Sequence, residues 1–206
     1  MISFDHVQAM QIDVLKEVGN IGAGNAATAL SALLDKPVDM TVPTAKLIPF
    51  SEITESLGGD ESVVTAVYLR VFGDVPGNLF FILTEDAVSA LLYELFHCRI
   101  QAAHMNELER SAIAEIGNIL AGSYLSSLAE FTSLHLTPSV PSITIDMAGA
   151  VLSFGLIQAG TMGNKAVMID TAFNEGKKNE IQAHIFLIPD PQSLPVIFTA
   201  LGVPSE

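Results

Sequence analysis

The sequence predicts a mixed α/β (α+β) fold: a single domain of two pseudo-two-fold-related repeats, with long paired helices packed on an antiparallel sheet. Three observations lead to this prediction. Residues 15–24, LKEVGNIGAG, recur at 113–122 as IAEIGNILAG. Each copy begins with the apolar spacing of a long amphipathic helix, and each later contains a β-rich hairpin. Two copies of about 100 residues indicate gene duplication of one unit rather than a solenoid of short repeats.

The register of the repeat is constant along the chain. Four positions match at a spacing of 98 residues: Asp13 with Ser111, Glu17 with Glu115, Asn20 with Asn118, and Pro43 with Pro141. Three identities and one polar pair without a gap are hard to produce by chance. No linker rich in Gly, Ser or Pro separates the copies. We therefore expect one domain over residues 1–206, with repeats at about 7–100 and 105–204.

The elements of the first copy follow from local patterns. Apolar residues at three- and four-residue spacing predict its long helix. Turn residues between two β-rich runs predict a hairpin, and Thr84 is a suitable N-cap for the closing helix. In chain order we expect a helix over Val7–Leu34, an extended stretch containing Pro43, a short helix over Ser51–Leu57, strands Ser62–Phe72 and Leu79–Leu83 joined by Asp74–Asn78, and a helix over Glu85–His97.

The second copy repeats this order. The apolar run 147–158 could equally be a strand, but the repeat register aligns it with the short helix of the first copy, so we expect a helix. Pro191 suits the first turn of the last helix. In chain order we expect a helix over Glu107–Phe131, an extended stretch containing Pro141, a helix over Met147–Gln158, strands Lys165–Ala172 and Ile181–Pro189 joined by Asn174–Asn179, and the helix that Pro191 opens.

Composition narrows the classes of partner. Half of the residues are hydrophobic and 16% are charged, which is typical of a folded chain. A formal net charge of −14, with nine Lys and Arg, argues against a nucleic-acid or anionic-membrane partner. The N-terminus lacks the pattern of a signal peptide, and apolar runs such as Leu79–Leu83 are too short to insert across a bilayer. We expect a cytoplasmic monomer.

The single cysteine, Cys98, cannot form an internal disulfide. It makes one Cys/His pair with His97, which is too few ligands for a structural zinc site. We therefore expect a packed thiol and no metal site in this chain.

A polar stripe recurs on the first helix of each copy. On a helix that turns about 100° per residue, Asp13, Asn20 and Gly24 fall within about 60° of Glu17, away from the apolar positions. The second copy repeats this stripe with Ser111, Glu115, Asn118 and Gly122. One such stripe is explained by solvation alone. Two in register, each with an Asn in mid-helix where Asn is a mediocre helix former, favour a selected function.

The residue types narrow the chemistry. Glu and Asn without a neighbouring Ser, Cys or His make a poor nucleophilic triad, and one acid per stripe does not supply the paired carboxylates of a glycosidase. The glycines of residues 19–24 have the spacing of a dinucleotide-binding fingerprint written backwards. No strand is predicted before them, so we do not expect a phosphate-binding loop here. An amide can orient a water and a carboxylate can pair with a lysine of another protein, which together suit phosphoryl hydrolysis.

The pattern Asp/Ser-x-x-x-Glu-x-x-Asn, followed by Pro after 22 intervening residues, occurs in both copies. It resembles the signature of the CheC family of chemotaxis phosphatases, whose relatives are CheX and FliY. The resemblance extends over essentially the whole chain, and the length is similar to that of the CheC branch. It implies a hydrolase that dephosphorylates CheY, a response regulator phosphorylated on aspartate.

The resemblance also implies residue roles. Carried over by position, these are orientation of the attacking water by Asn20 and Asn118, contact with the regulator's lysine by Glu17 and Glu115, auxiliary parts for Asp13 and Ser111, and structural parts for Pro43 and Pro141. The chain would need no cofactor of its own, because the Mg²⁺ belongs to the bound regulator.

A second partner follows from the same resemblance. CheC proteins also bind CheD, a receptor deamidase, and the region around Asp146 with the helix after it is similar to the family's CheD-docking segment. A helix N-cap is an equally good interpretation of Asp146. The main functional alternative is therefore a non-catalytic adaptor that binds phospho-CheY and regulates CheD. A structural flagellar switch component is disfavoured, because the additional switch domain of FliY is missing.

Overall fold

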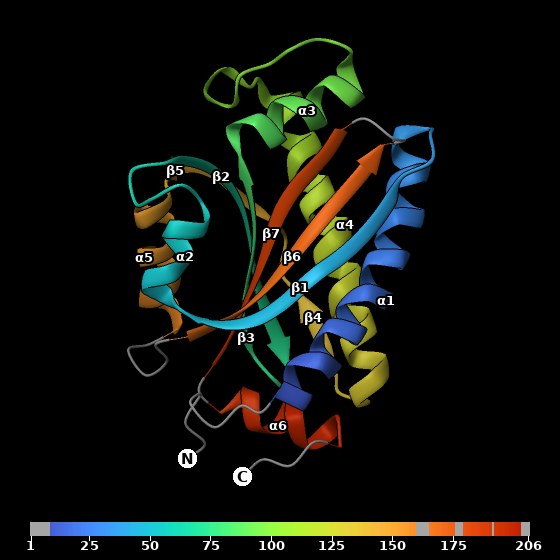
Figure 1. Cartoon of the computed structure of the whole chain (residues 1–206), viewed down its shortest axis with the longest axis vertical. Helices are drawn as coiled ribbons and strands as arrows, with labels where there is room; N and C mark the ends of the chain where they lie inside the picture. Colours follow the sequence, from blue (N-terminus) through green and yellow to red (C-terminus); the bar gives the residue numbers. More distant parts are fainter. Residues whose placement is uncertain (1–8, 160–164, 176–178, 191, 203–206) are drawn as a thin grey trace.

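Two long helices, α1 (Ala9–Leu34) and α4 (Glu107–Thr132), lie side by side on one face of a single antiparallel sheet (Figure 1). Two shorter helices, α2 (Phe50–Ser56) and α5 (Ala148–Ala159), cover the other face. The structure is a computed structural model that describes residues 9–159, 165–175, 179–190 and 192–202. The protein is thus built of three layers, with the sheet in the middle.

Seven strands form the sheet in the order β1-β6-β7-β3-β2-β4, and β5 follows β4 along the outer side of β2. The strands and the remaining helices are β1 Asp39–Pro49, β2 Val63–Gly73, β3 Gly77–Thr84, β4 Leu136–Pro138, β5 Ser142–Met147, β6 Lys165–Glu175, β7 Asn179–Pro189, α3 Glu85–Phe96, the 3-10 helix η2 Ala102–His104, and α6 Ser193–Ala200.

Strands of the two copies interleave in this sheet. β1 of the first copy pairs with β6 of the second, while β4 and β5 of the second copy pair with β2 of the first. β3 and β7 pair with each other at the centre. Exchanging the two copies leaves the strand order unchanged, as a pseudo-two-fold axis between β3 and β7 requires. Because the first strand of each copy lies on the hairpin of the other, we infer that the copies fold together.

The central strands separate two apolar clusters. Leu79, Phe81 and Leu83 of β3 pack toward α1 and α4, and Phe80 and Ile82 pack toward α2 and α5. All five side chains are at most 2% exposed. A strand buried on both faces needs apolar residues at every position, which explains why this segment reads as a continuous apolar run.

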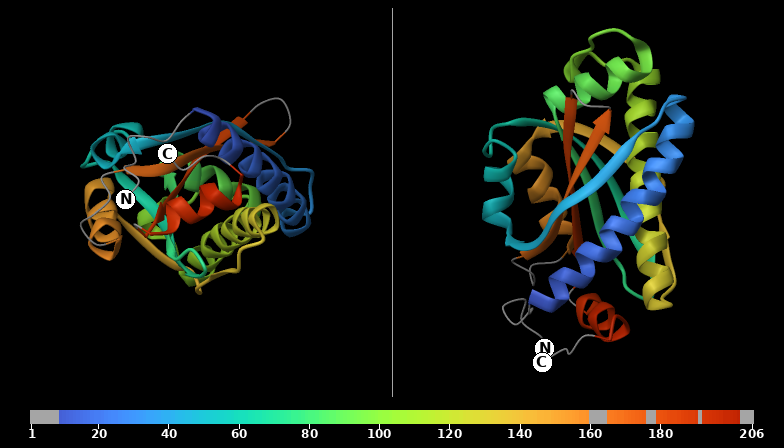
Figure 2. Two further views of the ribbon diagram at one scale, coloured as in Figure 1. Left: turned by 90° about the horizontal axis from the view of Figure 1, so that it is seen from below. Right: turned by 45° about the vertical axis from the view of Figure 1, so that its right-hand side comes forward.

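The long helices run in opposite directions and touch closely near their middles (Figure 2). A Cβ atom on Gly22 would lie 3.0 Å from the Tyr124 Cα, so a larger residue would push the two helices apart by a few tenths of an ångström. The Tyr124 hydroxyl lies 3.0 Å from Thr171 Oγ1 of β6. Burial raises the pKa of Tyr124 to about 12, so this phenol stays protonated and joins α4 to the sheet.

The predicted mixed α/β fold, with paired helices on an antiparallel sheet, is confirmed. The segment after β5 is helical, so the strand alternative for it is wrong. Thr84 caps α3 by accepting from the Ala87 N–H, and the helix ends at Phe96, because His97 takes the left-handed conformation with φ of 55°. The extended stretch of the second copy, expected as one element, is two strands, β4 and β5.

Element ends differ by a few residues. The short helix α2 begins one residue before the predicted Ser51, and the first hairpin turn is shorter than predicted because β3 already begins at Gly77. Helix α4 continues one residue past Phe131. The start of the first predicted helix at Val7, part of the second hairpin turn, and Pro191 lie outside the described residues.

Candidate functional site

The predicted polar stripe of the first copy faces solvent. Asp13, Glu17, Asn20 and Gly24 are all exposed on α1. Leu15 and Val18, on the opposite side of the helix, are each 4% exposed in the core. In the second copy Ser111 and Glu115 are exposed on α4, and Asn118 is half-buried. Each copy therefore presents an acid and an amide one helical turn apart.

A glycine precedes each of these amides and lies against the sheet. A Cβ atom on Gly117 would lie 2.8 Å from the Cβ and Cγ1 atoms of Val67 in β2. On Gly19 its nearest neighbour, Tyr124 Cε1, would be 3.6 Å away. The glycine therefore sets how closely α4 approaches the sheet beneath Asn118. The sequence repeats the Gly-Asn pair but does not reveal this contact.

The proline of the first motif lies in a β-bulge. Two residues of β1, Val42 and Pro43, lie opposite the single residue Thr171 of β6, where the register shifts between Thr41 and Thr44. Proline has no N–H to contribute to a ladder and is found in strands mainly at edges and bulges. The Val42 N–H, freed from the ladder, donates to Asn20 Oδ1 over 3.2 Å. The amide of the motif is thus bonded to the backbone of the residue that precedes the proline of the motif.

The second motif has an irregularity at the matching place. β4 ends at Pro138 and β5 begins at Ser142, so three residues lie opposite two residues of β2. Here Ser139 takes up the pairing: its N–H donates to Arg70 O over 2.8 Å, and its Oγ accepts from the Arg70 N–H over 3.0 Å. One extra residue therefore interrupts the pairing in both copies, next to Pro43 and Pro141.

The two polar faces differ in detail. Val140, the counterpart of Val42, is 86% exposed, whereas Val42 is 3% exposed. Asn118 Nδ2 donates to Glu115 Oε2 over 3.5 Å, a long contact. Asn20, by contrast, is held by the backbone of β1. In the first copy the amide is tethered to the sheet, and in the second it is paired only with its own helix among the described residues.

Asp146 lies apart from both faces. It is exposed on β5, on the side of the sheet that carries α5, because Ile143 and Ile145 point into the other cluster. Its Oδ1 accepts from the Met147 N–H. The first N–H groups of α5, those of Ala148 and Gly149, donate to backbone carbonyls of Ser62 and Asp60. The N-cap interpretation of Asp146 is therefore wrong.

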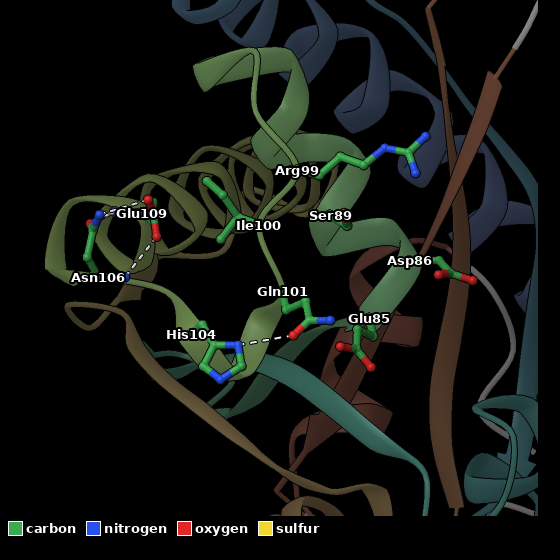
Figure 3. Close-up of a pocket in the computed structure, with 9 residues that line it drawn as sticks. All are labelled: Glu85, Asp86, Ser89, Arg99, Ile100, Gln101, His104, Asn106 and Glu109. Carbon is green, nitrogen blue, oxygen red and sulfur yellow. Dashed lines mark hydrogen bonds between the residues drawn. The ribbon is translucent and has the colours of Figure 1, made fainter.

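Two hollows lie near the elements that carry the predicted site residues. A groove of about 650 Å³ runs between α3, η2 and the start of α4 (Figure 3). Both carboxylate oxygens of Glu109 in its wall are bound by Asn106, the N-cap of α4. A second hollow of about 380 Å³ lies beside Asp146, with Phe80 and Val151 in its wall. Neither of these two hollows contains a residue of the two Glu/Asn faces.

The described residues contain no group of three or more His, Cys, Asp or Glu side chains that could hold a metal ion. Within the same residues, no helix is both long and apolar enough to cross a membrane. Cys98 is exposed, contrary to the packed thiol expected from the sequence.

Comparisons with family models and with the sequences of known proteins both find matches to this chain. The family model described as CheC-like matches residues 10–47 and 108–145, two segments with the same 98-residue spacing as the repeat. CheY-P phosphatase CheC of Bacillus subtilis is 41% identical over 206 residues, which cover 98% of this chain and 99% of that protein. Flagellar motor switch phosphatase FliY of the same species is 29% identical, over 68% of this chain and 37% of FliY.

Solved structures agree on the fold. The crystal structure of Thermotoga maritima FliY superimposes with a TM-score of 0.78 and 17% identity, covering 96% of this chain and 98% of that one. The match to the Bacillus subtilis protein over nearly the full length of both sequences, together with the two family-model matches, shows that this chain belongs to the CheC-like family.

Proposed function

We propose that this protein hydrolyses the aspartyl phosphate of the response regulator CheY. The observation that carries the proposal is the solvent-facing acid and amide found in the same register on α1 and α4. Relatives support it, because the Bacillus subtilis protein that is 41% identical bears the name CheY-P phosphatase. A second relative is named as a flagellar motor switch phosphatase.

The proposed mechanism requires only one amide and one carboxylate from each face of this protein. Asn20 or Asn118 enters the regulator's active site and holds a water in line with the phosphorus. The water oxygen bonds to phosphorus as the bond to the aspartyl oxygen breaks, which releases phosphate and restores the carboxylate. Glu17 or Glu115 pairs with the regulator's lysine and fixes the orientation, and the regulator supplies the Mg²⁺. Catalysis of this kind is mainly positioning, so an exposed surface suffices.

The direct test follows the decay of phosphorylated CheY with a small molar fraction of this protein, and measures binding in parallel. Many phosphates released per molecule would support the enzyme. Binding that leaves the decay at its spontaneous rate would instead support the non-catalytic adaptor.

The two Glu/Asn faces are expected to contribute unequally to the rate of CheY dephosphorylation. To enter a partner, Asn20 must give up its bond from Val42 N–H, a loss of about 1 kcal/mol, or roughly fivefold in rate. Among the described residues, Asn118 has no such tether to the sheet and contacts only Glu115 of its own helix. We therefore expect Asn118→Ala to leave several times less activity than Asn20→Ala, measured at saturating phospho-CheY. Equal losses, or a larger loss from Asn20→Ala, would contradict this.

We further propose that CheD docks at Asp146. The carboxylate is exposed and lies beside the 380 Å³ hollow, whose wall combines apolar Phe80 and Val151 with the hydroxyls of Ser142 and Thr144. Such a mixed surface suits a protein partner.

Asp146→Ala should weaken CheD binding about tenfold, which is the effect of losing one central contact of about 1.4 kcal/mol. The rate of CheY dephosphorylation should not change. Glu130→Ala, which removes an exposed acid at the far end of α4, is the matched control. Equal CheD affinity for both variants in a titration would refute docking at Asp146.

A further inference from the structure

The two Glu/Asn faces lie at opposite edges of the sheet. Asn20 reaches β1, which pairs only with β6 among the described strands and so forms one edge. Helix α4 lies over β2, where Gly117 meets Val67, and it also contacts β4 and β5 at the other edge. Four strands separate the edges. At about 4.8 Å per step, the edges are about 24 Å apart measured along the sheet.

The helices separate the faces further along their length. Gly22 of α1 lies opposite Tyr124 of α4, and the two helices run in opposite directions (Figure 2). Glu17 precedes Gly22 by five residues and Glu115 precedes Tyr124 by nine. Because the helices are antiparallel, these offsets add, which gives about 21 Å along the helix axes at a rise of about 1.5 Å per residue.

The pseudo-two-fold axis fixes the directions in which the faces point. It passes between β3 and β7, so it carries the β1 edge onto the β4–β5 edge. Seen from below, α1 lies on the β1 side of the body and α4 on the β4–β5 side (Figure 2). In the plane of the sheet, a partner at one face therefore approaches from the opposite direction to a partner at the other face.

We infer that one chain binds two phosphorylated CheY molecules at the same time, one at each edge of the sheet. This inference rests on the proposed function for the identity of the partner. A compact domain of about 100 residues has a radius of gyration of about 13 Å and thus a diameter of about 35 Å. Two such bodies, each centred outside its own edge, stand farther apart than one diameter and do not collide.

The test is the stoichiometry of the saturated complex. CheY is held in its phosphorylated conformation with beryllofluoride, a stable mimic of the acyl phosphate, and is titrated into the full chain in sedimentation velocity experiments. The wild-type chain should take up two CheY molecules. Glu17→Lys and Glu115→Lys place a like charge against the regulator's lysine, and each should take up one. Both glutamates are exposed, so the fold should tolerate these changes.

The outcomes separate this inference from the proposed function. A wild-type chain that saturates at one CheY, while each single variant also binds one, would overturn simultaneous binding and leave the phosphatase proposal intact. Two CheY molecules bound to the Glu17→Lys/Glu115→Lys double variant would overturn the inference by placing the contacts elsewhere. Absence of both binding and dephosphorylation by the wild-type chain would overturn the proposed function itself.

Discussion

Replacing both Asn20 and Asn118 by Ala should lower CheY dephosphorylation by about 10²–10³-fold, close to the spontaneous rate. Loss of one preorganised polar group at a reacting centre commonly has an effect of this size. Both substitutions are needed, because each face carries its own acid and amide. The measurement is the decay of phosphorylated CheY at equal concentrations of wild-type and variant protein.

Asn25→Ala is the matched control for this experiment. Asn25 is exposed on α1 like Asn20, but it lies about 80° around the helix from Glu17, outside the polar stripe. Its amide donates to Ser127 Oγ over 3.4 Å, between the two long helices. The control variant should keep its activity. Full activity of the Asn20→Ala/Asn118→Ala double variant would show that the two amides take no part in catalysis.

Affinity and turnover of the double variant distinguish the enzyme from the adaptor. If the amides act on water alone, affinity for beryllofluoride-bound CheY should stay within a few-fold of the wild type, because Glu17 and Glu115 still make the anchoring contact. Loss of binding in proportion to the loss of turnover would instead assign the amides to docking.

Features that repeat in the chain could be predicted from it. The helical stripe needs only the rotation per residue, so the exposure of Glu17, Asn20 and Glu115 follows from their spacing. The helix after β5 follows from the repeat register, although its apolar composition fits a strand equally well. Local turn and cap residues such as Thr84 also act within a few positions of the sequence.

Features that depend on the partner of a strand could not be predicted. A proline in an extended stretch indicates an edge or a bulge, but not that the bulge of β1 places the Val42 N–H against Asn20. The inequality of the two faces is also hidden, because Val42 and Val140 are the same residue type at matching positions and differ only in burial. Interleaving of the two copies in one sheet requires pairings between residues 63 to 135 positions apart, which no local pattern encodes.

Gly117→Ala should destabilise the protein, and Gly19→Ala should not. In both helices the change to Ala gains about 1 kcal/mol of helix propensity. On Gly117 the added Cβ would lie 2.8 Å from Val67, a fully buried and β-branched residue that has little freedom to move aside. Overpacking of this kind costs about 1–3 kcal/mol. On Gly19 the nearest contact of 3.6 Å is ordinary, so the gain in propensity remains.

The two variants should therefore differ by about 1–3 kcal/mol in the free energy of unfolding, which corresponds to roughly 2–12 °C in Tm for a domain of this size. Thermal unfolding measured in the same buffer decides this. Because Gly117 immediately precedes Asn118, the shift of α4 away from β2 should also lower turnover at the second site, while Gly19→Ala keeps the first site active. Equal stability of Gly117→Ala and Gly19→Ala would mean that Val67 moves aside for the added methyl group. Asn118 would then not be positioned by the close packing of α4 on β2.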